Sequence, residues 1–232
     1  MELLWEGIQR AVWLLITVDR EVLGISLLSL RVSLTATAVS LLVGIPLGTA
    51  IALTRFPGRN LVIGLINTGM GMPPVVVGLF ISILLFRSGP LGGLDLLYTP
   101  AAIIIAQIVI AAPIVTGLTL AAMQQLPATF RLQMLGLGAS RLQLLWLLLR
   151  QSWMPMLAAV MAGFGAVISE IGASMMVGGN IRGHTRVLTT ATVMETGKGN
   201  FDVAIALSLL LLAISFGVNY LLTLIQQRAK TP

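Results

Sequence analysis

Five stretches of this chain lack any charged residue, and this feature limits the folds open to it more than any other. A helix that crosses a bilayer needs about 20 mostly apolar residues, and the stretches are close to that length or longer. Charged residues make up only 9% of the chain, whereas a soluble domain contains about 25%. We therefore expect an all-α membrane protein with five transmembrane helices. The stretches are Val32–Thr54, Asn60–Phe86, Leu96–Phe130, Gln151–Ser169 and Val203–Gln227.

Two segments do not fit a simple span. In the third stretch, Pro100 is expected to start the helix and Pro127 to end it, which leaves the residues that follow for another role. Residues 1–22 alternate charged and apolar positions and contain Trp5 and Trp13, which predicts an N-terminal helix lying in the membrane interface. No repeat or low-complexity segment is found, so residues 1–232 are expected to form a single domain.

The charges that flank the stretches suggest an orientation in the membrane. Five spans put the two termini on opposite sides and divide the bases equally, so basic residues alone do not decide. All the acids except Glu170 fall on one side, which favours the other side as cytoplasmic, with the N-terminus outside and the C-terminus cytoplasmic. The expected cytoplasmic bases are Arg55, Arg59, Arg131, Arg141, Arg150, Arg228 and Lys230. The expected outer bases are Arg10, Arg20, Arg31, Arg87, Arg182, Arg186 and Lys198.

The sequence lacks the residue patterns that catalysis or metal binding requires. The chain contains no cysteine and one histidine, His184, which rules out a Cys–His pair and a multi-histidine metal site. Gly197-Lys198 lacks the upstream glycine and the following Ser or Thr of a phosphate-binding loop. We expect no catalytic residue, no metal site and no cofactor bound by this chain. The net charge of +6 is scattered between apolar runs, which fits orientation in a bilayer better than binding to nucleic acid.

Helix-breaking residues lie inside the second stretch. Pro73 and Pro74 come shortly after Gly69 and Gly71. Backbone groups freed inside a membrane must be satisfied by neighbouring protein or by cavity water. Two interpretations stay open: a packing kink, or a discontinuous helix that lines a pathway.

Glu170 is the acidic residue expected inside a span. An ionisable side chain there is costly, so it should face the bundle interior, pair with a base or reach water. No second acid or histidine is expected in a span to form a proton relay, so a structural or gating tie is preferred over proton coupling. Gly44 and Gly48, four residues apart, predict close contact between two helices.

Two further segments read as soluble. Residues 128–152 have a glycine-containing centre, Gly136 to Ser140, which would break a continuous helix and predicts two short helices joined by a turn. Residues 178–201 are polar, glycine-rich and too long for a simple connector, which makes them a candidate functional loop.

The motifs in these segments resemble a known family. The Gly138-Ala139-Ser140 turn resembles the cytoplasmic coupling segment of ATP-binding-cassette importer permeases, although Leu132-Gln133-Met134 stands where that family has Glu-Ala-Ala. Glu170–Ala173 is similar to a Glu-Phe-Gly-Ala stretch of molybdate permeases. Other blocks resemble the tungstate-specific branch of the molybdate, tungstate and sulfate permeases. These blocks are Leu30–Thr37, Met72–Gly78, Ser88–Gly92, Val177–Arg186 and Glu195–Gly199.

The resemblance implies a type I importer permease fold in the cytoplasmic (inner) membrane. It implies a homodimer of this chain in contact with membrane lipid, two separate ATPase subunits that use ATP and Mg, and an external oxyanion-binding protein. The implied cargo is tungstate. A molybdate or sulfate permease is the near alternative. The alternative from another class is an ion-coupled secondary transporter, which would need ion-coupling residues in its spans and inverted repeats.

The resemblance also implies roles for particular residues. Because the coupling segment of that family is cytoplasmic, residues 178–201 are expected outside. Arg182 and Arg186 in that loop have two open interpretations, attraction of a dianion and a solvated loop face. The residues expected to couple to the ATPase are Leu137, Gly138, Ala139, Ser140 and Arg141. Those expected to shape the gate or pathway are Pro73, Pro74, Glu170 and Gly172. Those expected in the external docking or gating loop are Gly178, Gly179, Asn180, Arg182 and Arg186.

Overall fold

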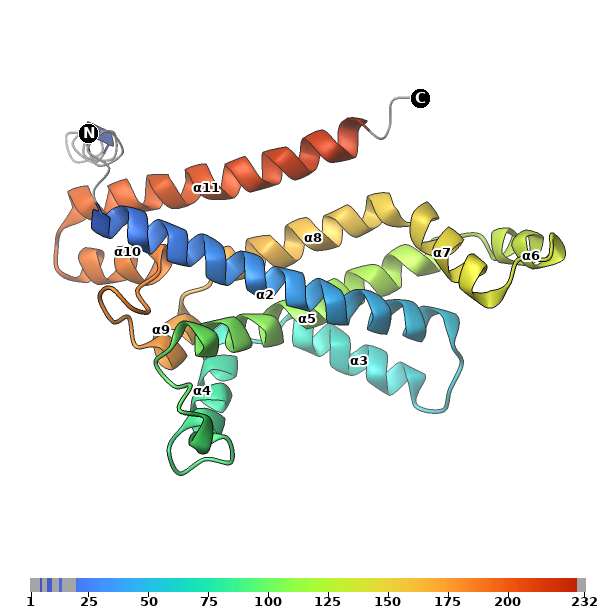
Figure 1. The fold of residues 1–232 in the computed structure, drawn as a ribbon, viewed down its shortest axis with the longest axis horizontal. Coiled ribbons are helices and arrows are strands. Elements are labelled where there is room, and N and C mark those ends of the chain that lie inside the picture. Colours follow the sequence, from blue (N-terminus) through green and yellow to red (C-terminus); the bar gives the residue numbers. More distant parts are fainter. Residues whose placement is uncertain (1–4, 6–7, 10–12, 14–19, 229–232) are drawn as a thin grey trace.

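The computed structural model describes residues 5, 8, 9, 13 and 20–228 (Figure 1). Within residues 20–228 the chain is helical and contains no strand. The predicted interfacial helix over residues 1–22 lies mostly outside the described residues, and its last three residues belong to α2. The helices are α2 (Arg20–Leu53), α3 (Arg59–Met70), α4 (Pro74–Leu85), η1 (Gly92–Leu94), α5 (Pro100–Gln124), α6 (Ala128–Gly136), α7 (Arg141–Gln151), α8 (Trp153–Ile168), α9 (Gly172–Gly178), α10 (Leu188–Gly197) and α11 (Phe201–Arg228).

Among the described residues, three helices are long and apolar enough to cross a membrane: α2, α5 and α11. Two further pairs pass the same test together but are sharply bent, α3 with α4 by 101° and α7 with α8 by 65°. The chain therefore has up to five spans, the number expected from the sequence, if each bent pair counts as one.

Two of the predicted stretches differ from the helices that the structure shows. Helix α2, which contains the first stretch, begins at Arg20 and carries Arg31 with its side chain exposed. A long basic side chain can extend its charge away from an apolar helix, so it does not have to end one. The stretch Asn60–Phe86 forms two helices, α3 and α4, because Pro73 and Pro74 begin α4 as the N-cap residue and the first helical residue. Of the two open interpretations, the structure has the discontinuous helix.

The centre of the bundle is the pair α2 and α5, which lie side by side with α8 against them (Figure 1). A methyl group added at Gly44 would lie 2.7 Å from the Val115 Cγ1 atom, and one at Gly48 would lie 2.5 Å from the Thr116 carbonyl oxygen. The predicted close helix contact at these two glycines is confirmed. Without side chains in the way the backbones approach closely, which is a common way of packing helices in lipid.

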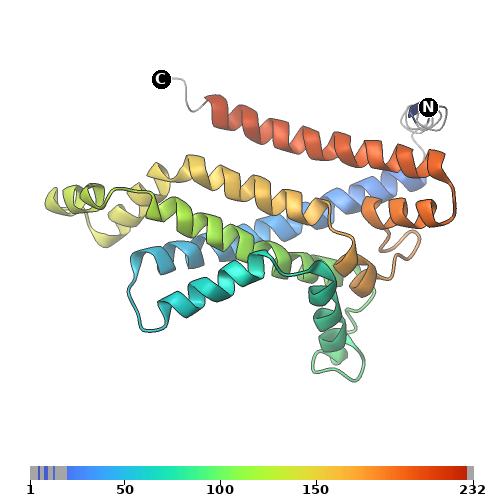
Figure 2. The ribbon, with the colours of Figure 1, turned by 180° about the vertical axis from the view of Figure 1, so that it is seen from behind.

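Charges are sorted between the two ends of the bundle. The 54–58 turn, α6, α7 and the end of α11 lie at one end, and α10 with the starts of α2 and α11 lies at the other, as both ribbon views show (Figures 1 and 2). In the described residues the first end carries Arg55, Arg131 and Arg141 and no acid. The second end carries Glu21 and Glu195 among its bases. The sorting of acids predicted from the sequence therefore exists in three dimensions.

The prediction of a loop over residues 178–201 is wrong for its second half, which forms α10. Leu188 and Ala191 of this helix are buried against Ile25 and Leu207, in a small core at the acid-containing end. The Leu188 N–H donates to the Ser29 hydroxyl of α2 over 2.7 Å, which satisfies a backbone donor at the start of α10. The threonine-rich sequence suggests a loop, but burial against α2 and α11 overrides the weak local propensity.

Candidate translocation and coupling sites

The chain breaks its helix between α8 and α9 at Glu170, which is only 4% exposed. Its carboxylate turns back onto the first turn of α9. One oxygen accepts the Ala173 N–H over 2.6 Å, and the other accepts the Ser174 N–H over 2.9 Å and the Ser174 hydroxyl over 2.5 Å. A carboxylate at this position accepts hydrogen bonds from backbone N–H groups that have no partner within the helix. Its negative charge is also stabilised by the positive end of the helix dipole. The prediction that Glu170 faces the interior is confirmed.

The carbonyl groups exposed by the same break are satisfied from two other helices. The Gln107 amide of α5 donates to the Val167 carbonyl over 3.0 Å. The Thr189 hydroxyl of α10 donates to the Glu170 carbonyl over 2.8 Å. The sequence reasoning missed both residues. Gln107 carried a usable signal, because it is an amide in the middle of the apolar stretch that became α5.

The second break, at Pro73 and Pro74, lies against the first. Gly172 at the start of α9 faces Val75 so closely that an added methyl group would lie 2.6 Å from the Val75 Cγ2 atom. One turn later Gly78 of α4 faces Ala173, with 2.7 Å from an added methyl group to the Ala173 Cα atom. The structure therefore joins the two helix starts that the sequence predicts as parts of the gate.

The predicted coupling segment is a helix–turn–helix, as expected from its glycines. The Ala139 N–H donates to the Met134 carbonyl and the Gly138 N–H to the Leu135 carbonyl, each over 3.0 Å. This is a Schellman motif, with Gly138 in the left-handed conformation at φ +84°. Ser140 then caps α7 in a capping box with Gln143. Four residues thus close one helix and open the next.

The surface of this helix–turn–helix is apolar and basic. Leu137 is 81% exposed and Leu142 is 79% exposed. A shallow groove of about 450 Å³ is lined by Leu137 together with Gly138 and Trp146. Isolated exposed leucines are ordinary, but an exposed leucine in an open groove, with a second one in the first turn of α7, forms a patch suited to contact with another surface.

Residues Gly178 to Arg186 form a tightly held turn. The Thr185 hydroxyl donates to the Gly178 carbonyl over 2.5 Å and accepts the Ile181 N–H over 3.0 Å. Gly179 has φ +69° and lies against the Tyr98 ring. Asn180 also has a positive φ, +50°, which asparagine tolerates better than most residues. The predicted loop is therefore an ordered element in its first half.

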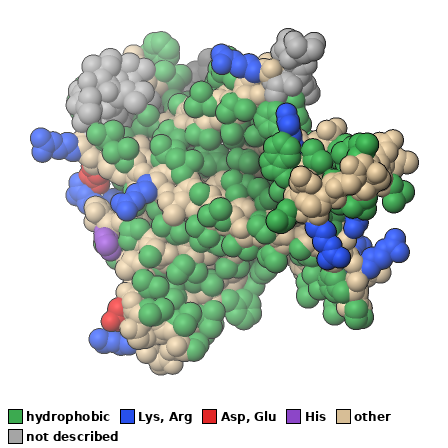
Figure 3. All heavy atoms as spheres, turned by 45° about the vertical axis from the view of Figure 1, so that its right-hand side comes forward, with side chains coloured by type: hydrophobic (Ala, Val, Ile, Leu, Met, Phe, Trp, Pro, Cys, Tyr) green, Lys and Arg blue, Asp and Glu red, His purple; other side chains and the backbone are tan. Residues whose placement is uncertain are grey.

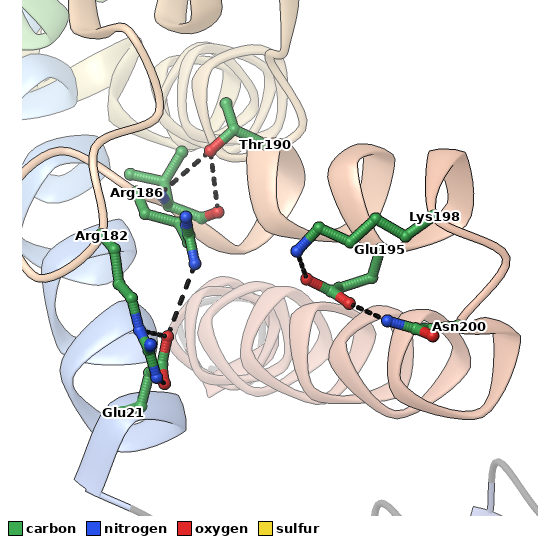
Figure 4. Close-up of polar contacts among 8 residues, drawn as sticks. Glu21, Arg182, Arg186, Thr190, Glu195, Lys198 and Asn200 are labelled. Carbon is green, nitrogen blue, oxygen red and sulfur yellow. Dashed lines mark hydrogen bonds and ion pairs between the residues drawn. The ribbon is translucent and has the colours of Figure 1, made fainter.

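Arg182 and Arg186 are held by Glu21 at the start of α2 (Figure 4). The Arg182 Nε–H donates to Glu21 Oε1 over 2.8 Å, and Arg182 Nη2 pairs with the other oxygen. The Arg186 Nη1 atom lies 3.5 Å from Glu21 Oε1. Residues about 160 positions apart in the chain thus meet at one carboxylate, a pairing that no local sequence pattern reveals.

A second carboxylate at this end, Glu195, has its own partners (Figure 4). The Asn200 amide donates to Glu195 over 2.7 Å, and the Lys198 ammonium group donates over 2.8 Å. Both hydrogen bonds favour the charged form and lower the pKa of Glu195 below its ordinary value, with Asn200 as the larger cause.

These features together define a class. A helical bundle with two broken spans, and with a helix–turn–helix at one end, has the fold of the membrane subunits of ATP-binding-cassette importers. The chain superposes on a chain of the MetNI methionine ABC transporter in an inward-facing conformation with a TM-score of 0.67, covering 94% of this chain and 95% of that one. The two sequences are 19% identical, so this likeness establishes the fold alone.

The chain belongs to the family of binding-protein-dependent transport system inner membrane components, whose model matches residues 44–231. It is 41% identical over 227 residues to the tungstate uptake system permease protein of Peptoclostridium acidaminophilum, covering 98% of this chain and 100% of that one. It is 40% identical over 202 residues to a probable anion ABC transporter permease protein of Haloferax volcanii, covering 85% and 87%. This membership favours the importer interpretation over the ion-coupled secondary transporter.

Proposed function

We propose that this chain is the permease subunit that carries tungstate through an ATP-binding-cassette importer. The observation that carries the proposal is the 41% identity to a tungstate uptake permease along the full length of both chains. Two of the blocks of resemblance, Met72–Gly78 and Val177–Arg186, lie at the Pro73 break and at the turn that follows α9.

The proposed partners follow from the surfaces of the chain. Two ATPase subunits, which use ATP and Mg, dock on the exposed leucines and bases around Gly138, so this end is cytoplasmic. An external oxyanion-binding protein docks at the opposite end, over the Gly178–Arg186 turn. A second copy of this chain completes the pathway, because Pro73 and Pro74 are exposed at the surface of a single chain. Lipid covers the remaining apolar faces.

The proposed mechanism uses the two helix breaks as one gate. ATP binding brings the ATPases together and moves the Gly138 segment, and α8 transmits the movement to Glu170 at its far end. Because Gly172 and Gly78 hold α9 against α4, both breaks move together. Few charges line the spans, which suits a cargo that passes through without tight binding.

The test is transport by the reconstituted complex. The permease, its ATPase and its binding protein are placed in liposomes, and uptake of tungstate is measured with ATP present on the ATPase side. We expect uptake that requires ATP and the binding protein and that exceeds uptake of molybdate or sulfate. Preference for either of those anions would contradict the tungstate assignment. Uptake driven by an ion gradient without ATP would contradict the class.

A further inference from the structure

A hollow of about 530 Å³ lies at the acid-containing end, beside the start of α2 and the turn before α10. Its polar lining consists of Arg20, Glu21, Arg182, His184 and Arg186. In Figure 3 the histidine lies at one edge of the molecule, with basic side chains and a carboxylate close by. The external oxyanion-binding protein is proposed to dock at this end, but no ligand has been proposed for the hollow itself.

The described residues that line the hollow carry an excess of positive charge. Among them three arginines face one carboxylate, which leaves two formal positive charges. Glu21 already engages Arg182 through both of its oxygens, and Arg186 through one of them. Arg20 is exposed and pairs with no acid in the described part of the chain. A concave basic surface concentrates field lines and attracts anions.

Arg186 adds a donor that its protein neighbours do not use. Its side chain is 14% exposed. Its Nε–H is buried and has no hydrogen-bond partner among residues 20–228. Most buried donors in proteins are paired, so the unpaired Nε–H leaves the guanidinium of Arg186, a residue that lines the hollow, short of an acceptor.

We propose that this hollow binds a tetrahedral oxyanion group, held by Arg20, Arg186 and His184. Guanidinium groups donate to phosphate-like oxygens in a fixed planar fork, and a doubly charged anion would balance the excess charge of the lining. The group belongs either to a phospholipid headgroup or to a free oxyanion in solution. Both sources present negatively charged oxygens on a tetrahedral centre, with one negative charge on a phosphodiester headgroup and two on a free dianion.

A second hollow, of about 400 Å³, continues from the first and shares Glu21, Arg182 and Arg186 with it. Its other walls combine Val22, Met194 and Leu207 with the charged side chains of Glu195 and Lys198. A phospholipid with its headgroup in the first hollow would place its acyl chains beside the exposed Leu23 and Leu27 of α2, whereas a free oxyanion would occupy the basic hollow alone. The two sources thus predict different behaviour in membranes of different lipid composition.

The lipid test uses the full transporter in nanodiscs of mixed phosphatidylglycerol and phosphatidylcholine. Native mass spectrometry counts the phosphatidylglycerol molecules that stay bound to the permease after mild delipidation. The variant Arg20→Gln removes one donor without disturbing the Glu21 pairs. The variant Arg87→Gln removes an exposed arginine on the loop after α4 and serves as the matched control. If a headgroup is bound, Arg20→Gln lowers its retention about tenfold and Arg87→Gln leaves it unchanged.

The free-anion test uses nanodiscs of phosphatidylcholine alone. Binding of tungstate and of inorganic phosphate is measured by titration calorimetry, and a bound free oxyanion predicts an affinity about tenfold weaker in Arg20→Gln than in the parent. The variant Arg186→Lys removes the buried Nε–H donor and keeps the positive charge, and it is measured in both the lipid test and the free-anion test.

The proposal is overturned if Arg20→Gln changes neither lipid retention nor oxyanion affinity, or if Arg87→Gln changes them as much. It is also overturned if only association with the binding protein depends on Arg20, because the occupant is then an acidic protein surface. Neither measurement involves ATP or uptake, so its outcome is separate from that of the transport assay.

Discussion

The carboxylate of Glu170 offers the sharpest test of how the broken span is held. Glu170→Gln keeps the size of the side chain but replaces one acceptor oxygen by an NH₂ group, which cannot accept. The carboxylate receives the Ala173 N–H on one oxygen and two donors from Ser174 on the other. In the variant one backbone N–H at the start of α9 must lose its partner, and Ala173 is fully buried.

The size of the effect follows from these contacts. An unsatisfied buried N–H costs about 1–3 kcal/mol, and replacing hydrogen bonds to a charged group by neutral ones costs about 1 kcal/mol more. We therefore expect a loss of about 2–4 kcal/mol. For a chain of this size that corresponds to a fall in Tm of roughly 5–15 °C.

The assay is thermal unfolding of the purified permease in detergent, with two comparison variants. Ser174→Ala removes only the hydroxyl donor and should cost about 1 kcal/mol. Asp95→Asn neutralises an exposed carboxylate, keeps a residue that tolerates the positive φ of this position, and is the matched control for loss of charge. If Glu170→Gln unfolds within about 1–2 °C of the parent, the carboxylate does not hold the start of α9. If it also leaves uptake and binding-protein-stimulated ATPase activity intact, Glu170 has no part in the gate.

Three further predictions concern the turn at Gly138, the contact between α4 and α9 at Gly78, and the Glu195 carboxylate. Gly138→Ala forces a side chain into a left-handed conformation at a cost of about 1–2 kcal/mol and should weaken stimulated ATPase activity. The control Gly136→Ala, at the open end of α6, should leave that activity unchanged. Equal activity in the two variants would refute the assignment of the Gly138 turn to coupling. Gly78→Leu pushes α4 off Ala173 and should lower stability by about 1–3 kcal/mol in thermal unfolding, and an unchanged Tm would show that the contact is not maintained in the membrane. Because the pKa of folded Glu195 is lowered, its stabilising contribution is fully present above about pH 4.3 and is lost as the pH falls through the lower folded-state pKa. The difference in Tm between the parent and Glu195→Gln should therefore close at acid pH, and a difference independent of pH would contradict the assignment.

The sequence predicted those features whose cause is local. Charge-free runs indicate helices in lipid, adjacent prolines indicate a helix start, and a glycine flanked by helical residues indicates a turn. For this reason the turn at Gly138 follows from the amino-acid sequence alone, and the break at Pro73 is one of the two interpretations that the sequence allows.

The features that escaped prediction depend on contacts between distant residues. Helix α10 forms because α2 supplies Ser29 and an apolar wall, neither of which is visible in the sequence around Leu188. Gln107 and Thr189 became recognisable as supports of the break only when three helices were placed together. The ion pair between Arg182 and Glu21 stood in neither of the two open interpretations, because the two residues lie 161 positions apart in the chain.

The joint between α7 and α8 has a mechanical consequence. Ser152 ends one helix and precedes the first residue of the next, and its buried hydroxyl contacts the Met123 sulfur, so no slack loop separates the two. With 11 residues, α7 is about 16 Å long, and a rotation of about 10° at Ser152 moves its far end by about 3 Å. Helix α7 is thus a short, stiff lever, and α8, on the other side of Ser152, ends at the break beside Glu170. A force applied to the start of α7 is therefore passed along α8 to the interior of the bundle.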